Sequence, residues 1–213
     1  MRAAASILWL LFFATIAGAQ DFQQWNEVDI TAAVGKADFL VPWLARTDSR
    51  LPNPQLAATG LVADYALPRH LTLTGGYLFA DLPQHSAHVH IPLAAVSESF
   101  RLGHIAVVDR NRFEKLVGYG TSPVRYRNRI LADCPLGVHD RWHVFASDEI
   151  FFDLSAAAWS QNRFQSGGGA RINRRLALDV YYLQRNSTGV APTTRVLGTT
   201  LTVKLNPGDR LYR

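Results

Sequence analysis

Charged side chains recur at every second position along two neighbouring segments of this sequence. Residues 110–114 (RNRFE) and 125–129 (RYRNR) both show this alternation. Successive side chains of a β-strand point to opposite faces, so each segment would carry its charges on one face. If the two segments pair as a hairpin, facing arginines repel each other unless carboxylates lie between them. Glu114 supplies one such carboxylate, and Glu149 on a later strand supplies another.

These residues are predicted to form an ion-pair network, because the planar guanidinium group of arginine can contact two carboxylate oxygens at once. The predicted members are Arg110, Arg112, Glu114, Arg125, Arg127, Arg129, Glu149 and Arg163. Two interpretations are open. The network is a structural ladder that fills and stiffens a narrow lumen, or it lines a lumen that binds or conducts anions.

A serine nucleophile with a histidine base and an acidic partner would indicate a lipid hydrolase. The residues of these types that could contribute are Ser97, Glu98, His104, His88, His90, His143 and Ser147. Ser97 and Glu98 are adjacent on a predicted strand and therefore point to opposite faces. We expect no catalytic residues in this chain, and a lipid-modifying outer-membrane hydrolase stays as an alternative.

Two further motifs have the composition of a ligand site without its spacing. His88 and His90 share one face of a strand and could contact a metal ion, but no third ligand stands nearby in a supporting pattern. The glycines at 167–169 lack the Lys-Ser/Thr pair and the helix of a phosphate-binding loop. Glycine inside a strand more often marks a bulge, a bend or the close approach of a neighbour, and the glycines at 75–76 have the same explanation. We therefore expect no metal site and no cofactor.

The elements that would position these residues follow an N-terminal export signal. Residues 1–2 add a positive charge, residues 7–16 (ILWLLFFATI) are apolar, and residues 17–19 (AGA) are small. This order predicts a secretory signal peptide over residues 1–19. The mature chain then spans residues 20–213 as a single outer-membrane β-barrel domain. The one cysteine, Cys134, lies far from the apolar run, so lipoprotein processing is not expected.

The mature sequence alternates between apolar and polar residues with the period of a β-strand. Candidate strands lie near residues 23–34, 36–46, 55–66, 70–80, 86–99, 102–117, 122–134, 140–153, 163–173, 175–185 and 193–205. Predicted short turns alternate with longer loops along the chain, as in outer-membrane barrels. The sequence thus predicts an all-β fold, a closed antiparallel transmembrane β-barrel of about 10–12 strands. Because bacterial barrels usually have an even number of strands, one of these candidates is expected to be a misread hairpin or a loop.

Aromatic residues and the last strand favour a membrane location. Trp and Tyr residues near predicted strand ends match the interfacial girdles of membrane proteins. They are Trp25, Trp43, Tyr65, Tyr77, Tyr119, Tyr126, Trp142, Trp159, Tyr181 and Tyr182. Near the C-terminus, Gly198, Leu201 and Val203 follow the Gly-x-x-apolar-x-apolar pattern of the assembly signal of outer-membrane barrels, although the chain runs on to Arg213.

Several segments, taken in order along the chain, resemble an uncharacterised family of small bacterial outer-membrane β-barrels, catalogued as a domain of unknown function. The segments are 24–27 (QWNE), 110–114 (RNRFE), 125–129 (RYRNR), 148–152 (DEIFF) and 161–163 (QNR) before a glycine-rich strand. The resemblance implies a barrel at the bacterial outer membrane. It implies no activity, because none is assigned to the family.

The sequence is thus interpreted as an outer-membrane β-barrel, structural or transport-type, with an Arg/Glu-rich lumen and no enzymatic activity. The alternatives are a soluble periplasmic β-barrel that binds a small apolar ligand and the hydrolase named above. The expected partners are outer-membrane lipid and the barrel-assembly machinery, with a small anionic solute as a candidate ligand. The formal net charge of +5 is modest and spread along the chain, so nucleic acid is not an expected partner. Whether the lumen is open, and in what oligomeric state the protein works, stay open.

Overall fold

The computed structural model describes residues 22–48, 54–118, 120, 122–137, 140–188 and 193–206. The predicted signal peptide lies outside these residues. The described chain forms eleven strands and one short 3-10 helix. They are β1 (Phe22–Val34), β2 (Ala37–Asp48), β3 (Pro54–Ala66), β4 (Leu71–Leu82), η1 (Pro83–His85), β5 (Ala87–Leu102), β6 (Ile105–Lys115), β7 (Val124–Leu136), β8 (Trp142–Asp153), β9 (Ala158–Arg171), β10 (Leu176–Ser187) and β11 (Thr194–Lys204). Among them, no helix is long and apolar enough to span a membrane, a finding that does not bear on spanning strands.

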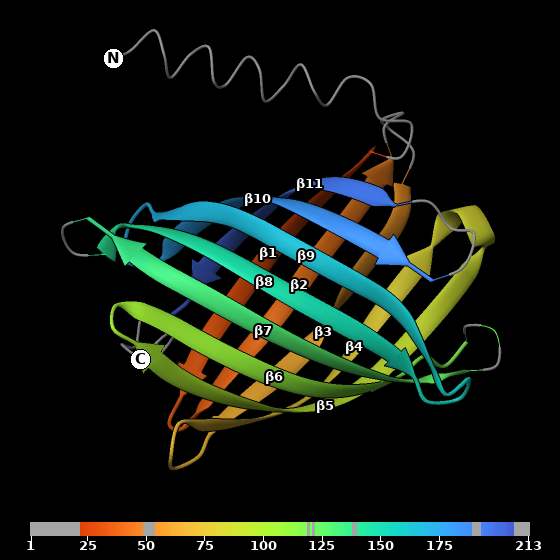
Figure 1. Ribbon diagram of the computed structural model, residues 1–213, viewed down its shortest axis with the longest axis horizontal. Helices are drawn as coiled ribbons and strands as arrows, with labels where there is room; N and C mark the ends of the chain where they lie inside the picture. Colours follow the sequence, from red (N-terminus) through yellow and green to blue (C-terminus); the bar gives the residue numbers. More distant parts are fainter. Residues whose placement is uncertain are drawn as a thin grey trace, which may run out of the picture.

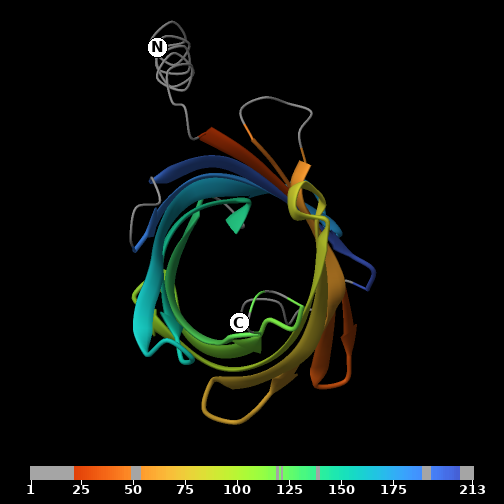
Figure 2. The same cartoon turned by 90° about the vertical axis from the view of Figure 1, so that its right-hand side faces the viewer.

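The strands close into a single barrel (Figures 1 and 2). Each strand pairs antiparallel with the next one along the chain, and β1 closes the ring by pairing parallel with β11. The predicted all-β closed barrel is therefore confirmed, with eleven strands and one parallel seam. The expectation that one candidate strand was misread is wrong. With an odd number of strands, the first and last strands run in the same direction, so the barrel closes through a parallel pair.

The connections between strands lie at two ends of the barrel. One end, which we call the tight-turn end, holds connections such as 35–36 and 103–104, where Gly35 and Gly103 adopt positive φ angles of 63° and 62°. The other end, which we call the loop end, holds the connections at 83–86 and 116–123, among others. The difference in length is smaller than predicted, because strands extend into the loops predicted at residues 81–87 and 154–162. β9 begins at Ala158, and β4 and β5 are separated only by η1 and Ser86.

The outer face of the wall is largely apolar. Exposed outward side chains include Trp43 on β2, Leu61 on β3, Trp142 on β8 and Trp159 on β9, each at least half exposed. Trp25 departs from the predicted aromatic girdle, because it lies inside the barrel and is only 4% exposed. Tyr181 also faces the interior, where it forms a core with Trp25, Leu183 and Val196.

A polar strip interrupts the apolar outer wall over β6 and β7. Its side chains alternate with the inward-facing arginines and therefore face outward. The Tyr126 hydroxyl donates a hydrogen bond of 2.6 Å to Asn111 Oδ1, and Asn128 Nδ2 donates one of 2.6 Å to Asp109 Oδ1. The strip is thus internally hydrogen-bonded.

Three inward glycines make room for large neighbours, as predicted for the glycines at 167–169. A Cβ on Gly169 would collide with His143 and Asp179, one on Gly167 would meet Tyr181, and one on Gly198 would collide with the Tyr181 ring. Of the glycines at 75–76, only Gly76 has a neighbouring strand close to where a side chain would lie. A Cβ on Gly76 would lie 2.9 Å from the Leu61 carbonyl oxygen, whereas Gly75 has open space around it.

Candidate functional site: an arginine–glutamate network inside the barrel

Strand pairing brings the predicted charged residues together on the inner face of β6, β7, β8 and β9. In the register, Glu114 lies beside Arg125, Arg112 beside Arg127, and Arg110 beside Arg129. The next pairs continue the row, with Arg129 beside Glu149 and Glu149 beside Arg163. The hairpin that places the two arginine segments side by side is therefore present.

Glu114 is the most enclosed charge of the network, with a side chain only 1% exposed. Arg112 and Arg127 each contact its Oε1 atom at 2.6 Å. Arg125 donates to the other oxygen, Oε2, from both Nε and Nη2. Three guanidinium groups therefore hold one carboxylate, which offsets the loss of its hydration.

Glu149 forms the second centre of the network. Arg127 donates to it from Nη2, at 2.8 Å to Oε1 and 2.9 Å to Oε2. Arg110 contacts Oε1 at 3.2 Å, and Arg163 approaches Oε2 at 4.0 Å. Because Arg127 also binds Glu114, it bridges the two carboxylates.

Phe151, which is fully buried, lies among the arginines. The guanidinium carbons of Arg163, Arg127 and Arg125 lie 4.4, 4.6 and 5.2 Å from the centroid of its ring. These distances allow cation–π attraction, which adds to the ion pairs in holding the arginines in place.

Positive charge exceeds negative charge in this network. Its six arginines and two glutamates leave a formal excess of four positive charges. Among the described residues, Arg129 forms no ion pair, and its Nε atom is buried without a hydrogen-bond partner. The network is thus connected through Arg127 and carries a net positive charge, which Glu27 on β1 offsets in part through its attraction to Arg110 and Arg129.

The structure also contains an inward-facing cluster that the sequence patterns did not reveal. His143 contacts Asp133 Oδ2 from Nδ1 at 2.6 Å and Asp179 Oδ1 from Nε2 at 2.9 Å. Both ring nitrogens are thus occupied by carboxylates. The three residues come from β8, β7 and β10, so no local spacing could have predicted their meeting.

The other residues considered for catalysis are dispersed. His88 and His90 face outward on β5, His88 contacts Asp81 at 3.1 Å, and His90 hydrogen-bonds to Tyr77. Ser97 and Glu98 point to opposite faces of β5, as predicted, with Ser97 beside Arg110. In the described part of the chain, no group of three or more His, Cys, Asp or Glu side chains is arranged to hold a metal ion.

The fold and this site define a closed eleven-stranded β-barrel with a buried arginine–glutamate network. The chain belongs to the family described as "Protein of unknown function (DUF2490)", whose sequence profile matches residues 22–195. The resemblance seen in the sequence is therefore confirmed. A search of curated proteins gives no significant match.

Among solved structures, the barrel is similar to OmpTdeltaL8, a loop L8 deletion mutant of OmpT, an outer membrane protein of Vibrio cholerae. The two share 10% sequence identity, with a TM-score of 0.42. The match covers 78% of this chain and 58% of that one.

Proposed function

We propose that this protein is an outer-membrane β-barrel of structural or transport type, with a lumen that favours anions. One observation carries the proposal: large apolar side chains face outward, and charged side chains face inward. A membrane barrel has this polarity, because lipid surrounds its outer face and its interior is polar. In a water-soluble protein, outward Trp43, Leu61 and Trp142 would instead form an extensive exposed apolar surface.

The network supports both halves of the proposal. Ion pairs between four strands stiffen the barrel from within, which is a structural role. The excess of arginine over glutamate gives the interior a positive potential, which suits passage or retention of a small anion.

The two alternatives have less support. A soluble barrel for an apolar ligand is favoured by the polar strip around Asn111 and Asn128 on the outer wall. It is disfavoured by the charged interior, where Glu114 and its arginines would meet the ligand. A hydrolase has little support, because no hydrogen bond among the described residues joins a serine hydroxyl to a histidine ring and both nitrogens of His143 are occupied.

Membrane fractionation tests the proposal. The exported protein should be recovered in the outer membrane and should need detergent for extraction. On gels its unboiled form should migrate differently from its boiled form, because a closed barrel resists detergent unfolding. Recovery in the soluble periplasmic fraction would contradict the proposal and favour the soluble barrel.

A further inference from the structure

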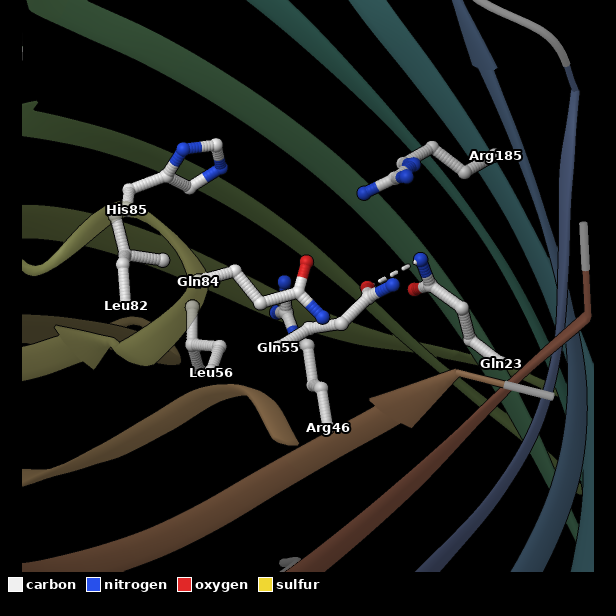
Figure 3. A pocket seen from close by; sticks show the side chains of 8 residues that line it. All are labelled: Gln23, Arg46, Gln55, Leu56, Leu82, Gln84, His85 and Arg185. Atoms are coloured by element: carbon white, nitrogen blue, oxygen red, sulfur yellow. Dashed lines mark hydrogen bonds between the residues drawn. The ribbon is translucent and has the colours of Figure 1, made fainter. Parts of the chain in front are cut away.

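A cavity of about 260 Å³ lies inside the loop end of the barrel (Figure 3). β1, β2 and β3 contribute Gln23, Arg46 and Gln55, and η1 contributes Gln84. Arg185 reaches toward the cavity from β10. This lining is distinct from the arginine–glutamate network, with which it shares no residue.

Among the described residues, the two arginines of this cavity have no carboxylate within ion-pair distance, although Glu27 on β1 attracts Arg46 from further away. Neither Arg46 nor Arg185 takes part in an ion pair there, and the Nε atom of each is buried without a hydrogen-bond partner. Arg185 also lies directly beside Arg163 in the strand register. Like charges placed opposite each other across strands are unfavourable, so an anion at this point would relieve the repulsion.

Neighbouring side chains hold the cavity in shape. The guanidinium carbon of Arg46 lies 3.8 Å from the centroid of the Trp25 ring. Trp25 Nε1 donates a hydrogen bond of 3.0 Å to Gln23 Oε1. Gln23 Nε2 in turn donates one of 2.7 Å to Gln55 Oε1, which Figure 3 shows. On the other side, Arg185 Nη2 donates to Thr194 Oγ1 at 2.8 Å. Gln23, Gln55 and the two arginines are therefore held in place before a ligand binds.

We propose that this cavity binds a small solute that carries an oxyanion, a phosphate or a carboxylate, on a hydroxylated body. Two guanidinium groups match an oxyanion, since each can donate two parallel hydrogen bonds. The glutamine amides and His85 around them can donate to and accept from hydroxyl groups. Because Arg46 and Arg185 face the interior, a lipid packed against the outer wall does not reach them, so the ligand is a free solute.

This inference goes beyond the proposed function, because the cavity would bind the same ligand in a soluble barrel. Calorimetric titration of the folded protein in detergent tests it, with glycerol 3-phosphate, glycerate and neutral glycerol as probes. The two anions should bind and glycerol should not. Each of Arg46→Gln and Arg185→Gln should weaken binding by about tenfold or more, as expected for a lost charge-assisted hydrogen-bond pair.

Arg195→Gln is the matched control, since Arg195 is exposed on the outer face of β11 next to the cavity wall. It should leave the affinity unchanged. Gel migration before and after boiling identifies any variant that fails to fold. Such a glutamine variant is then replaced by Arg46→Lys or Arg185→Lys, which keeps the positive charge but removes the planar guanidinium group. Equal binding of glycerol, no binding of either anion at millimolar concentration, or equal losses in all three glutamine variants would overturn the proposal.

Discussion

Glu114 and Arg127 are the residues on which the interior network depends. Glu114 accepts from three arginines, and Arg127 connects it to Glu149. Removing one member of a buried ion-pair group leaves its partners charged and unpaired. This destabilises a protein more than replacing the whole group by apolar residues does. Stability should therefore be more sensitive to loss of a glutamate here than to loss of any surface charge.

Glu114→Gln should lower the free energy of unfolding by about 3–5 kcal/mol, because three buried guanidinium groups would face a neutral amide. Urea titration of the refolded barrel, followed by tryptophan fluorescence, measures this loss. Glu98→Gln is the control, since Glu98 is exposed on the outer face of β5 and forms no ion pair among the described residues. Its effect should stay below about 1 kcal/mol. Equal effects of the two substitutions would contradict the central position of Glu114.

Residue patterns in the sequence predicted this network because its members lie on consecutive strands and follow the period of a strand. The same patterns placed Trp25 wrongly in an outer aromatic girdle. Its position depends on two partners that are remote in sequence, since Arg46 stacks on its ring and Gly198 lies beside it across the β1–β11 seam. The Asp133–His143–Asp179 cluster was missed for the same reason. Contacts between side chains on different strands depend on the stagger of the closed barrel. The alternation of polar and apolar residues along one strand does not specify this stagger.

At the scale of the elements, the eleven strands and a closed barrel were predicted, but the parallel pairing of β1 with β11 was not. Alternation and turn residues specify antiparallel neighbours, since each pair is joined by a short connection. The β1–β11 seam joins residues about 170 positions apart, as in the hydrogen bond of 2.8 Å from Thr199 Oγ1 to Asn26 Oδ1. The assumption of an even strand count argued against this closure, because the first and last strands of such a barrel can pair antiparallel only when the count is even. Here β1 and β11 pair parallel instead.

A disulfide across the seam tests the parallel register. Asn26 and Thr199 are Cα partners with outward side chains, so Asn26→Cys with Thr199→Cys should oxidise readily in a Cys134→Ser background. The linked chain should migrate faster than the reduced chain on a denaturing gel after boiling. Asn26→Cys with Leu201→Cys is the control, because Leu201 lies two residues further along the same face. Similar cross-linking of both pairs, or of neither, would show that the seam has another register.

At the scale of the whole molecule, the barrel combines an apolar outer face with a charged interior. The surplus of arginine lies in the network and at the loop end, whereas Asp133 and Asp179 lie toward the tight-turn end. The central network holds four surplus positive charges, and Arg46 and Arg185 add two more at the loop end. A solute entering from the loop end would thus meet positive charge first at the cavity and again at the network. This arrangement would attract anions over a distance set by the ionic strength.

Conductance across a planar lipid bilayer measures the consequence. With a gradient of potassium chloride, the reversal potential should have the sign expected for chloride passing more readily than potassium. Arg129→Glu should reduce this preference or reverse it, since Arg129 faces the interior without an ion-pair partner among the described residues and the substitution changes the charge there by two. Glu98→Arg, which makes the opposite change on the outer face, should leave the reversal potential unchanged. A preference for potassium in the unaltered protein would contradict an anion-favouring lumen. Absence of conductance would contradict transport and leave the network with a structural role, because ion pairs that fill the lumen also close it.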